Sequence, residues 1–127
     1  LDKFAHIMNS CDVVVAAHGA GLTNQVFLPN GAVVVQIVPL GIEWASEHYF
    51  GTPAIDMGLK YLEYKVWPNE TSLYDLYGED DPIISDPASV WAKGYRIVQD
   101  VYLNRQDFRI NLNRFKGTLL EVLQLLG

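Results

Sequence analysis

The residues best suited to chemistry gather in one short stretch, residues 18–24. They are His18, Gly19, Ala20, Gly21, Leu22, Thr23 and Asn24. An imidazole is the commonest general base and also a hydrogen-bonding group for a ligand. Small residues let an anion approach backbone N–H groups closely, and a following hydroxyl and amide add side-chain donors. These residue types fit a catalytic loop, a phosphate cradle or a plain strand-to-helix turn.

Known motifs separate these three interpretations only in part. An oxyanion-hole loop of the α/β-hydrolase kind needs a Gly-x-Ser-x-Gly nucleophile elbow, which the sequence lacks. The Walker pattern and the dinucleotide-binding fingerprint are missing as well. The residues alone therefore disfavour the hydrolase and leave the plain turn and the anion site as alternatives.

The elements around this stretch place it in an α/β fold. Residues 13–17 form an apolar run without alternation, which predicts a strand buried on both faces of a parallel sheet. Residues 22–28 predict a short helix that ends at Pro29-Asn30-Gly31, and residues 32–38 predict a second doubly buried strand. The resulting βαβ unit puts the turn at the carboxyl end of a strand, where parallel sheets bind phosphorylated ligands.

Periodicity and turn residues predict further elements on either side of this unit. Helices are expected over 1–9, 42–49 and 114–126, with a break at Gly51-Thr52-Pro53 and a continuation over 54–57. A third strand over 59–66 alternates in part and is aromatic, as a strand nearer the sheet edge would be. A last short strand is expected over 107–112.

A surface excursion and then a helix are predicted between the third and last strands. Residues 67–88 hold three prolines and the acidic run Glu79-Asp80-Asp81, which indicates a long surface excursion. Asp86 and Pro87 then have the types of an N-cap and a first helical residue. The helix they begin carries its apolar side on Val90, Trp91, Ile97, Val98 and Val101.

Composition excludes several classes of protein. A length of 127 residues with 50% hydrophobic residues suits one folded domain. A net charge of −6 disfavours nucleic-acid binding and attachment to anionic membranes. Cys11 stands alone, so no disulfide framework or zinc site is expected, and we expect it to be a small buried apolar residue. The sequence opens inside an apparent helix without an initiator Met, so we expect a piece of a longer protein.

A family resemblance enters with the residues on both sides of the turn. The stretch "HGAGLTNQVFLPNGAVVVQIVP", residues 18–39, resembles the signature block of glycosyltransferase family 61. The segments "MGLKYLEYKV", "DPASVWAKGY" and "YLNRQDFRINLNRF" are similar to the plant members. The resemblance implies a two-domain GT-B enzyme with Rossmann-like parallel sheets. Residues 1–127 would be its C-terminal nucleotide-sugar-binding domain, and the N-terminal acceptor domain would lie outside this sequence.

The resemblance also implies roles for particular residues. The backbone amides of residues 19–22, with Thr23 and Asn24, would hold the diphosphate of a UDP-sugar in place of a metal or other cofactor. His18 would contact a phosphate or the sugar; it is also a candidate general base, although a base in the missing domain is favoured.

Residues outside the turn are candidates for the rest of the donor. Glu43 follows the second strand, where an acid can accept ribose hydroxyls, and its alternative is an exposed residue at a helix start. Trp44 is a candidate to stack on uracil or else a core anchor. Arg109 and Arg114 are candidates to neutralise phosphate.

Finally, the resemblance implies partners and a compartment. Plant members transfer xylose or arabinose from a UDP-sugar to xylan or related glycans, so the acceptor would be a polysaccharide or glycan of the cell wall. The enzyme would be a type II membrane glycoprotein of the Golgi lumen, or of the endoplasmic reticulum, anchored by a segment outside this sequence. Asn69 begins an N-glycosylation sequon in the predicted excursion. The alternative is a non-catalytic Rossmann-like module that binds nucleotides or acts as a scaffold.

Overall fold

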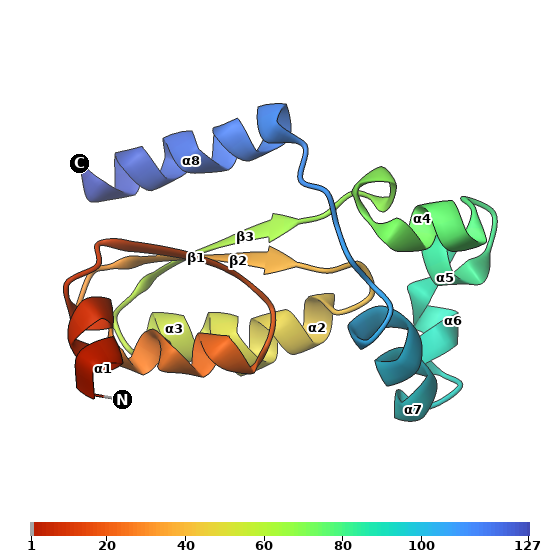
Figure 1. Ribbon diagram of the computed structural model, residues 1–127, viewed down its shortest axis with the longest axis horizontal. Helices are drawn as coiled ribbons and strands as arrows, with labels where there is room; N and C mark the ends of the chain where they lie inside the picture. The colour runs from red at the N-terminus through yellow and green to blue at the C-terminus, as the bar shows by residue number, and fades with distance from the viewer. Residues whose placement is uncertain (1) are drawn as a thin grey trace. The chain divides into compact units, whose positions relative to one another are not determined.

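A computed structural model describes residues 2–127, which divide into two units (Figure 1). The first unit comprises the described part of Leu1–Ile37, together with Trp44–Tyr64 and Leu112–Gly127. The second comprises Val38–Glu43 and Lys65–Asn111. Each unit has its own buried core, and each is described separately below.

A three-stranded parallel sheet organises the first unit. Its strands are β1 (Val13–Ala17), β2 (Val33–Val38) and β3 (Lys60–Lys65), in the order β1-β2-β3. β1 and β2 are in parallel register, with Val13 opposite Val33. The bonds from Lys60 N to Ala32 O and from Val66 N to Val38 O have the same offset, as parallel pairing of β2 with β3 requires. The predicted mixed α/β fold with a parallel sheet is thus confirmed, and the sheet is compatible with a Rossmann-like fold.

The position of each strand in the sheet explains its burial. β2 lies in the centre, and its three consecutive valines are fully buried. β1 was predicted to be buried on both faces, and this was wrong: it is an edge strand among the described residues, and Val15 is 43% exposed. A run of β-branched residues therefore correctly indicates a strand but does not tell a central strand from an edge strand.

Helices cover both faces of the sheet (Figure 1). Strand alternation directs Val34 to one face, where it packs with Leu22, Phe50 and Ala54 from η1 (Ala20–Phe27) and from the helix over residues 43–56. Val33 and Val35 face the other side and pack with Val122 of α8 (Leu112–Leu126). α1 (Asp2–Asn9) is confirmed as predicted, and the crossover between β1 and β2 is a 3₁₀ helix that begins two residues earlier than expected. Cys11 is half-buried beside the first of these clusters, broadly as expected.

The predicted break at residues 51–53 is wrong. α2 (Glu43–Ser46), the π-helix η2 (Glu47–Gly51) and α3 (Thr52–Asp56) follow one another without a break. The N–H of Thr52 bonds to the carbonyl of Glu47, five residues back, which widens the helix just before Pro53. Pro53 then occupies the first turn of α3, where a missing N–H is tolerated.

The second unit corrects two more expectations. Residues 67–88 lie mostly at the surface, as predicted, but they form short helices rather than an irregular excursion, and Leu73 and Ile84 are buried. The helices are η3 (Pro68–Glu70), α4 (Ser72–Tyr77), α5 (Pro82–Ser85), α6 (Pro87–Trp91), α7 (Tyr95–Val98) and the π-helix η4 (Gln99–Leu103). The predicted strand over 107–112 is reduced to one antiparallel bridge between Thr71 and Phe108.

The helix predicted to start at Asp86–Pro87 is confirmed only at its start. α6 begins at Pro87, but the Asp86 side chain makes no capping bond. Gly94, with a φ of 119°, separates α6 from α7, so the expected long helix is broken. Val90, Val98 and Val101 are buried as predicted, whereas Ile97 is 39% exposed. Within residues 2–127, no helix has the length and apolar character to cross a membrane.

Candidate functional site

The turn that follows β1 holds its backbone open. Gly19 is extended, with φ 162° and ψ 172°, and neither Gly19 nor Gly21 has a positive φ that would require glycine. A Cβ atom at either position would meet nothing within 4 Å. The N–H groups of Gly19, Ala20 and Gly21 have no hydrogen-bond partner among residues 2–127, whereas the N–H of Leu22 donates to Gly19 O. Neither backbone conformation nor crowding by the described residues therefore accounts for these two glycines.

The other residues of the turn stabilise its helical end. Leu22 is buried in the core below the sheet. Thr23 Oγ1 donates to Ala20 O over 2.7 Å, and Asn24 Nδ2 donates to Gly21 O over 3.0 Å. These two side chains were predicted to donate to a phosphate. The structure directs the Thr23 hydroxyl proton and one Asn24 N–H to the backbone of η1 instead.

His18 is held by a partly buried polar network, in which Gln36 and Ser46 are fully buried. Its Nδ1 lies 3.0 Å from Gln36 Oε1 and 3.2 Å from Ser46 Oγ. The ring also meets Phe50 edge to face, with centroids 5.3 Å apart. Burial lowers the pKa of His18, which favours the neutral imidazole. The Nε2 atom makes no hydrogen bond to the described residues.

The network continues along the same face of the sheet to β3. Gln36 Nε2 donates to Ser46 O over 3.0 Å and to the Tyr61 hydroxyl over 2.6 Å. Tyr61 in turn donates to Glu63 Oε1 over 3.0 Å. Burial and the hydrogen bond to Glu63 raise the pKa of Tyr61 well above its usual value, so the phenol keeps its proton.

Sequence reasoning missed the partners of His18. The available signal was Gln36, the single polar residue in the run Val33–Val38. A buried amide needs hydrogen-bond partners, so a glutamine in a buried strand predicts a polar group beside it. Ser46, Tyr61 and Glu63 could not be found in this way, because no sequence spacing relates them to Gln36.

Trp44 is not a core anchor. It is 58% exposed, and its ring stacks on His48 with centroids 4.3 Å apart. Tyr49, also 60% exposed, meets Trp44 edge to face. Of the two predicted roles for Trp44, the structure removes burial in the core, and stacking on a ligand stays a prediction.

The remaining predicted residues have local contacts. Glu43, in the second unit, accepts from Gly41 N over 3.3 Å through Oε1, and its role toward ribose stays a prediction. Arg114 donates to the Tyr64 hydroxyl over 3.1 Å and lies over the Tyr64 ring, with its guanidinium carbon 4.7 Å from the centroid. That side chain is therefore engaged within the first unit.

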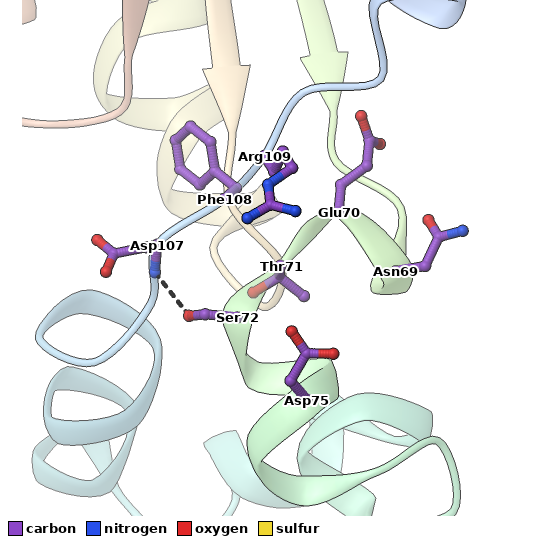
Figure 2. Close-up of a pocket in the computed structure, with 8 residues that line it drawn as sticks. All are labelled: Asn69, Glu70, Thr71, Ser72, Asp75, Asp107, Phe108 and Arg109. Atoms are coloured by element: carbon purple, nitrogen blue, oxygen red, sulfur yellow. Dashed lines mark hydrogen bonds between the residues drawn. The ribbon is translucent and has the colours of Figure 1, made fainter.

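A cavity of about 210 Å³ lies in the second unit (Figure 2). Its lining residues are Asn69, Glu70, Thr71, Ser72, Asp75, Asp107, Phe108 and Arg109. Two bonds connect its walls, from Asp107 N to Ser72 Oγ over 2.9 Å and from Ser72 N to Asp107 O over 2.7 Å. Figure 2 shows the Asn69 side chain pointing away from Ser72 and Asp75, and Asn69 is exposed, as a glycosylation acceptor must be. Sequence spacing gave no sign of this cavity, because the bridge between Thr71 and Phe108 brings distant segments together.

Among residues 2–127, no three His, Cys, Asp or Glu side chains are grouped as ligands of an ion.

Several curated proteins are similar to this chain. A xylan glycosyltransferase of Arabidopsis thaliana is 45% identical over 121 residues, which cover 95% of this chain and 24% of that protein. A β-1,2-xylosyltransferase of Oryza sativa is 47% identical over 124 residues, covering 97% of this chain and 22% of that protein. An α-1,3-arabinosyltransferase of Oryza sativa is 43% identical over 128 residues, covering 100% and 22%.

The matches cover only part of each relative. The chain spans about a quarter of the length of the curated relatives it matches. No protein-family model matches the chain, and no solved structure matches it.

Proposed function

Since the chain belongs to the family of plant xylan xylosyl- and arabinosyltransferases, as the resemblance to glycosyltransferase family 61 predicted, we propose that it holds the UDP-sugar donor of an inverting pentosyltransferase. The transferred sugar is xylose or arabinose, and the acceptor is xylan or a related glycan. The observation that carries this proposal is the open backbone of the turn after β1.

The turn has the features of a diphosphate cradle. Gly19 and Gly21 leave open space where a side chain would otherwise stand, and three successive N–H groups have no partner in the described chain. The turn follows the carboxyl end of a parallel strand and begins an eight-residue helix, so strand end and helix dipole both favour an anion there. A plain turn would need glycines for positive φ or for close packing, and these two glycines meet neither need.

These groups also suit the chemistry of inversion. In this reaction the acceptor hydroxyl attacks the anomeric carbon, and the bond from that carbon to the β-phosphate oxygen breaks. The hydroxyl proton passes to a general base, which we place in an acceptor domain outside this chain. Negative charge grows on the departing UDP, and the N–H groups of Gly19, Ala20 and Gly21 stabilise it without a metal.

Other parts of the proposal rest on the family and on the exposed aromatic residues. We assign residues 1–127 to the C-terminal domain of a GT-B fold, which a parallel sheet with helices on both faces supports. Trp44 is exposed and available to stack on uracil, and we assign Glu43 to the ribose hydroxyls. We place the enzyme in the Golgi lumen, where the exposed Asn69 would carry a glycan.

Blocking the turn tests the proposal. Gly21→Val fills open space that none of residues 2–127 occupies, so we expect a normal melting temperature and at least a tenfold loss of UDP affinity, measured by calorimetry. Gly117→Val is the matched control, since a Cβ at Gly117 also meets nothing within 4 Å and lies on α8. UDP affinity that survives Gly21→Val would refute the cradle. Binding of UDP without sugar transfer by the natural-length protein would support the non-catalytic alternative.

A further inference from the structure

We propose that Gln36 is a positioning residue that holds the His18 imidazole with its proton on Nδ1, so that Nε2 accepts a hydrogen bond from a hydroxyl group of the bound nucleotide sugar. This inference rests on the proposed function for its ligand. The orientation and the tautomer of the imidazole follow from the hydrogen-bond network alone.

The first step is the placement of Gln36. It is fully buried in the central strand, where its neighbours are valine and isoleucine. Strand alternation puts it on the same face of the sheet as Val34, the face covered by η1 and by the helix over 43–56. A buried amide costs stability unless it is hydrogen-bonded, and each polar atom of this amide has a partner.

The second step is the orientation of the amide. The carbonyl of Ser46 can only accept, so the Gln36 atom that lies 3.0 Å from it must be the NH₂ group. The Tyr61 hydroxyl accepts a hydrogen bond from the same NH₂ group and donates one to Glu63. The Ser46 carbonyl and the Tyr61 hydroxyl fix the orientation of the amide, and its oxygen then faces His18.

The third step is the tautomer of the imidazole. An amide oxygen 3.0 Å from Nδ1 requires a proton on Nδ1, since two lone pairs would otherwise face each other. Ser46 Oγ, at 3.2 Å, can accept a share of the same N–H. In the neutral ring, Nε2 therefore carries a lone pair and no proton. The lowered pKa of His18 is consistent with this neutral form.

The fourth step is the kind of group that such an atom can meet. A lone pair on Nε2 repels a phosphate oxygen but accepts from a hydroxyl. Two kinds of hydroxyl are available in a nucleotide sugar, those of the ribose and those of the transferred sugar. The shared chemistry is hydroxyl donation, and ligands with and without the sugar tell the two sources apart.

One substitution separates ligand binding from the structural role of His18. His18→Asn keeps an N–H group near the position of Nδ1 for Gln36 but removes the acceptor at Nε2. In the natural-length protein we expect it to keep its melting temperature and to bind UDP-xylose about tenfold more weakly, the value of one hydrogen bond. If UDP binding weakens equally, the hydroxyl that donates to Nε2 belongs to the ribose. If UDP binding is unchanged, that hydroxyl belongs to the transferred sugar. His18→Gln, whose amide oxygen can reach the Nε2 position, should restore part of the affinity.

The role of Gln36 has its own readout. In protein labelled with ¹⁵N-histidine, we expect His18 to show a protonated Nδ1 and an unprotonated Nε2. Gln36→Met, which has a similar volume and no amide, should give a mixture of tautomers and a several-fold loss of UDP-xylose affinity. If that variant does not fold, Tyr61→Phe removes one partner of the amide and should shift the tautomers in the same direction to a smaller extent.

Several results would overturn the inference. An unchanged tautomer in Gln36→Met and Tyr61→Phe would remove the positioning role. UDP affinity that rises as His18 is protonated would point to an imidazolium–phosphate contact. A fall in kcat with unchanged affinity in His18→Asn would make His18 a base. If the wild-type protein binds neither UDP nor UDP-xylose, the proposed function fails, and the ¹⁵N spectra still decide the role of Gln36.

Discussion

Gly51 lies against the ring of Tyr61, and a Cβ atom at Gly51 would come within 2.8 Å of a ring carbon. Gly51 has helical backbone angles, so its lack of a side chain serves this close approach and not an unusual turn. The Tyr61 ring cannot simply move away, because its hydroxyl is bonded to Gln36 and Glu63. The π-helix and the polar network are therefore packed as one structure.

The first prediction concerns this contact. Gly51→Ala should destabilise the fold by about 1–3 kcal/mol, because the added methyl group overpacks a site that cannot relax freely. Chemical denaturation would measure the loss. Gly117→Ala is the control, and it should be neutral or slightly stabilising, because its Cβ meets open space on a helix. Equal effects of the two substitutions would contradict the argument.

The second prediction concerns pH. Because burial lowers the pKa of His18 in the folded state, the unfolded state binds more protons as the pH falls below about 6.5. The stability that the neutral ring contributes is complete above the unfolded pKa and is lost as the pH falls toward the folded pKa. Urea denaturation between about pH 8 and pH 5 should show this slope. His18→Asn should have a flatter profile, and an identical profile would argue against the shift.

The third prediction contrasts the contributions of two sequon residues, Asn69 and Thr71, to stability. Thr71 is buried, and its Oγ1 caps α4 by accepting from Leu73 N over 3.2 Å. Thr71→Ala should therefore cost about 1 kcal/mol of stability, whereas the exposed Asn69→Gln should cost nothing measurable. Thr71→Ser keeps both the cap and the sequon and serves as the control. Expression in a secretory host should show a glycan on the wild type and on Thr71→Ser, and none on Asn69→Gln.

The fourth prediction concerns the exposed aromatic residues. Trp44→Ala removes a ring that stacks on His48 at the surface, so the melting temperature should change little. If Trp44 stacks on uracil, UDP affinity should fall about tenfold, in line with the value of a base–aromatic stack. Affinity for UDP should be lost to the same extent as affinity for UDP-xylose. Tyr49→Ala offers a comparison with a similarly exposed ring.

Local sequence signals predicted the parts of the fold that depend on local chemistry. The valine runs, the crossover and the C-terminal helix are all present. The errors arose where tertiary contacts determine the local structure. The edge position of β1 depends on which strands neighbour it, and the π turn before Pro53 depends on how the helix over 43–56 packs. The helices of residues 67–88 form because Leu73 and Ile84 find a core that turn-rich sequence does not reveal.

For the candidate site, the location was predicted from the sequence but the roles of its side chains were not. The turn from His18 to Asn24 lies at the strand end where it was expected. Its interpretation changed with two facts that spacing cannot provide: the glycines face open space, and the Thr23 and Asn24 side chains bond to their own helix. A single glutamine among valines was the one readable sign of the network behind His18.

The arrangement around His18 has a consequence for how this domain assembles. The ring follows β1, and its direct and indirect partners come from β2, the helix over 43–56 and β3. The imidazole can adopt its native state only after three strands and a helix have docked, so its ¹⁵N signal is a built-in indicator of sheet formation. A refolding experiment that follows this one ring would show when the completed sheet first places the hydrogen-bond acceptor Nε2 beside the turn.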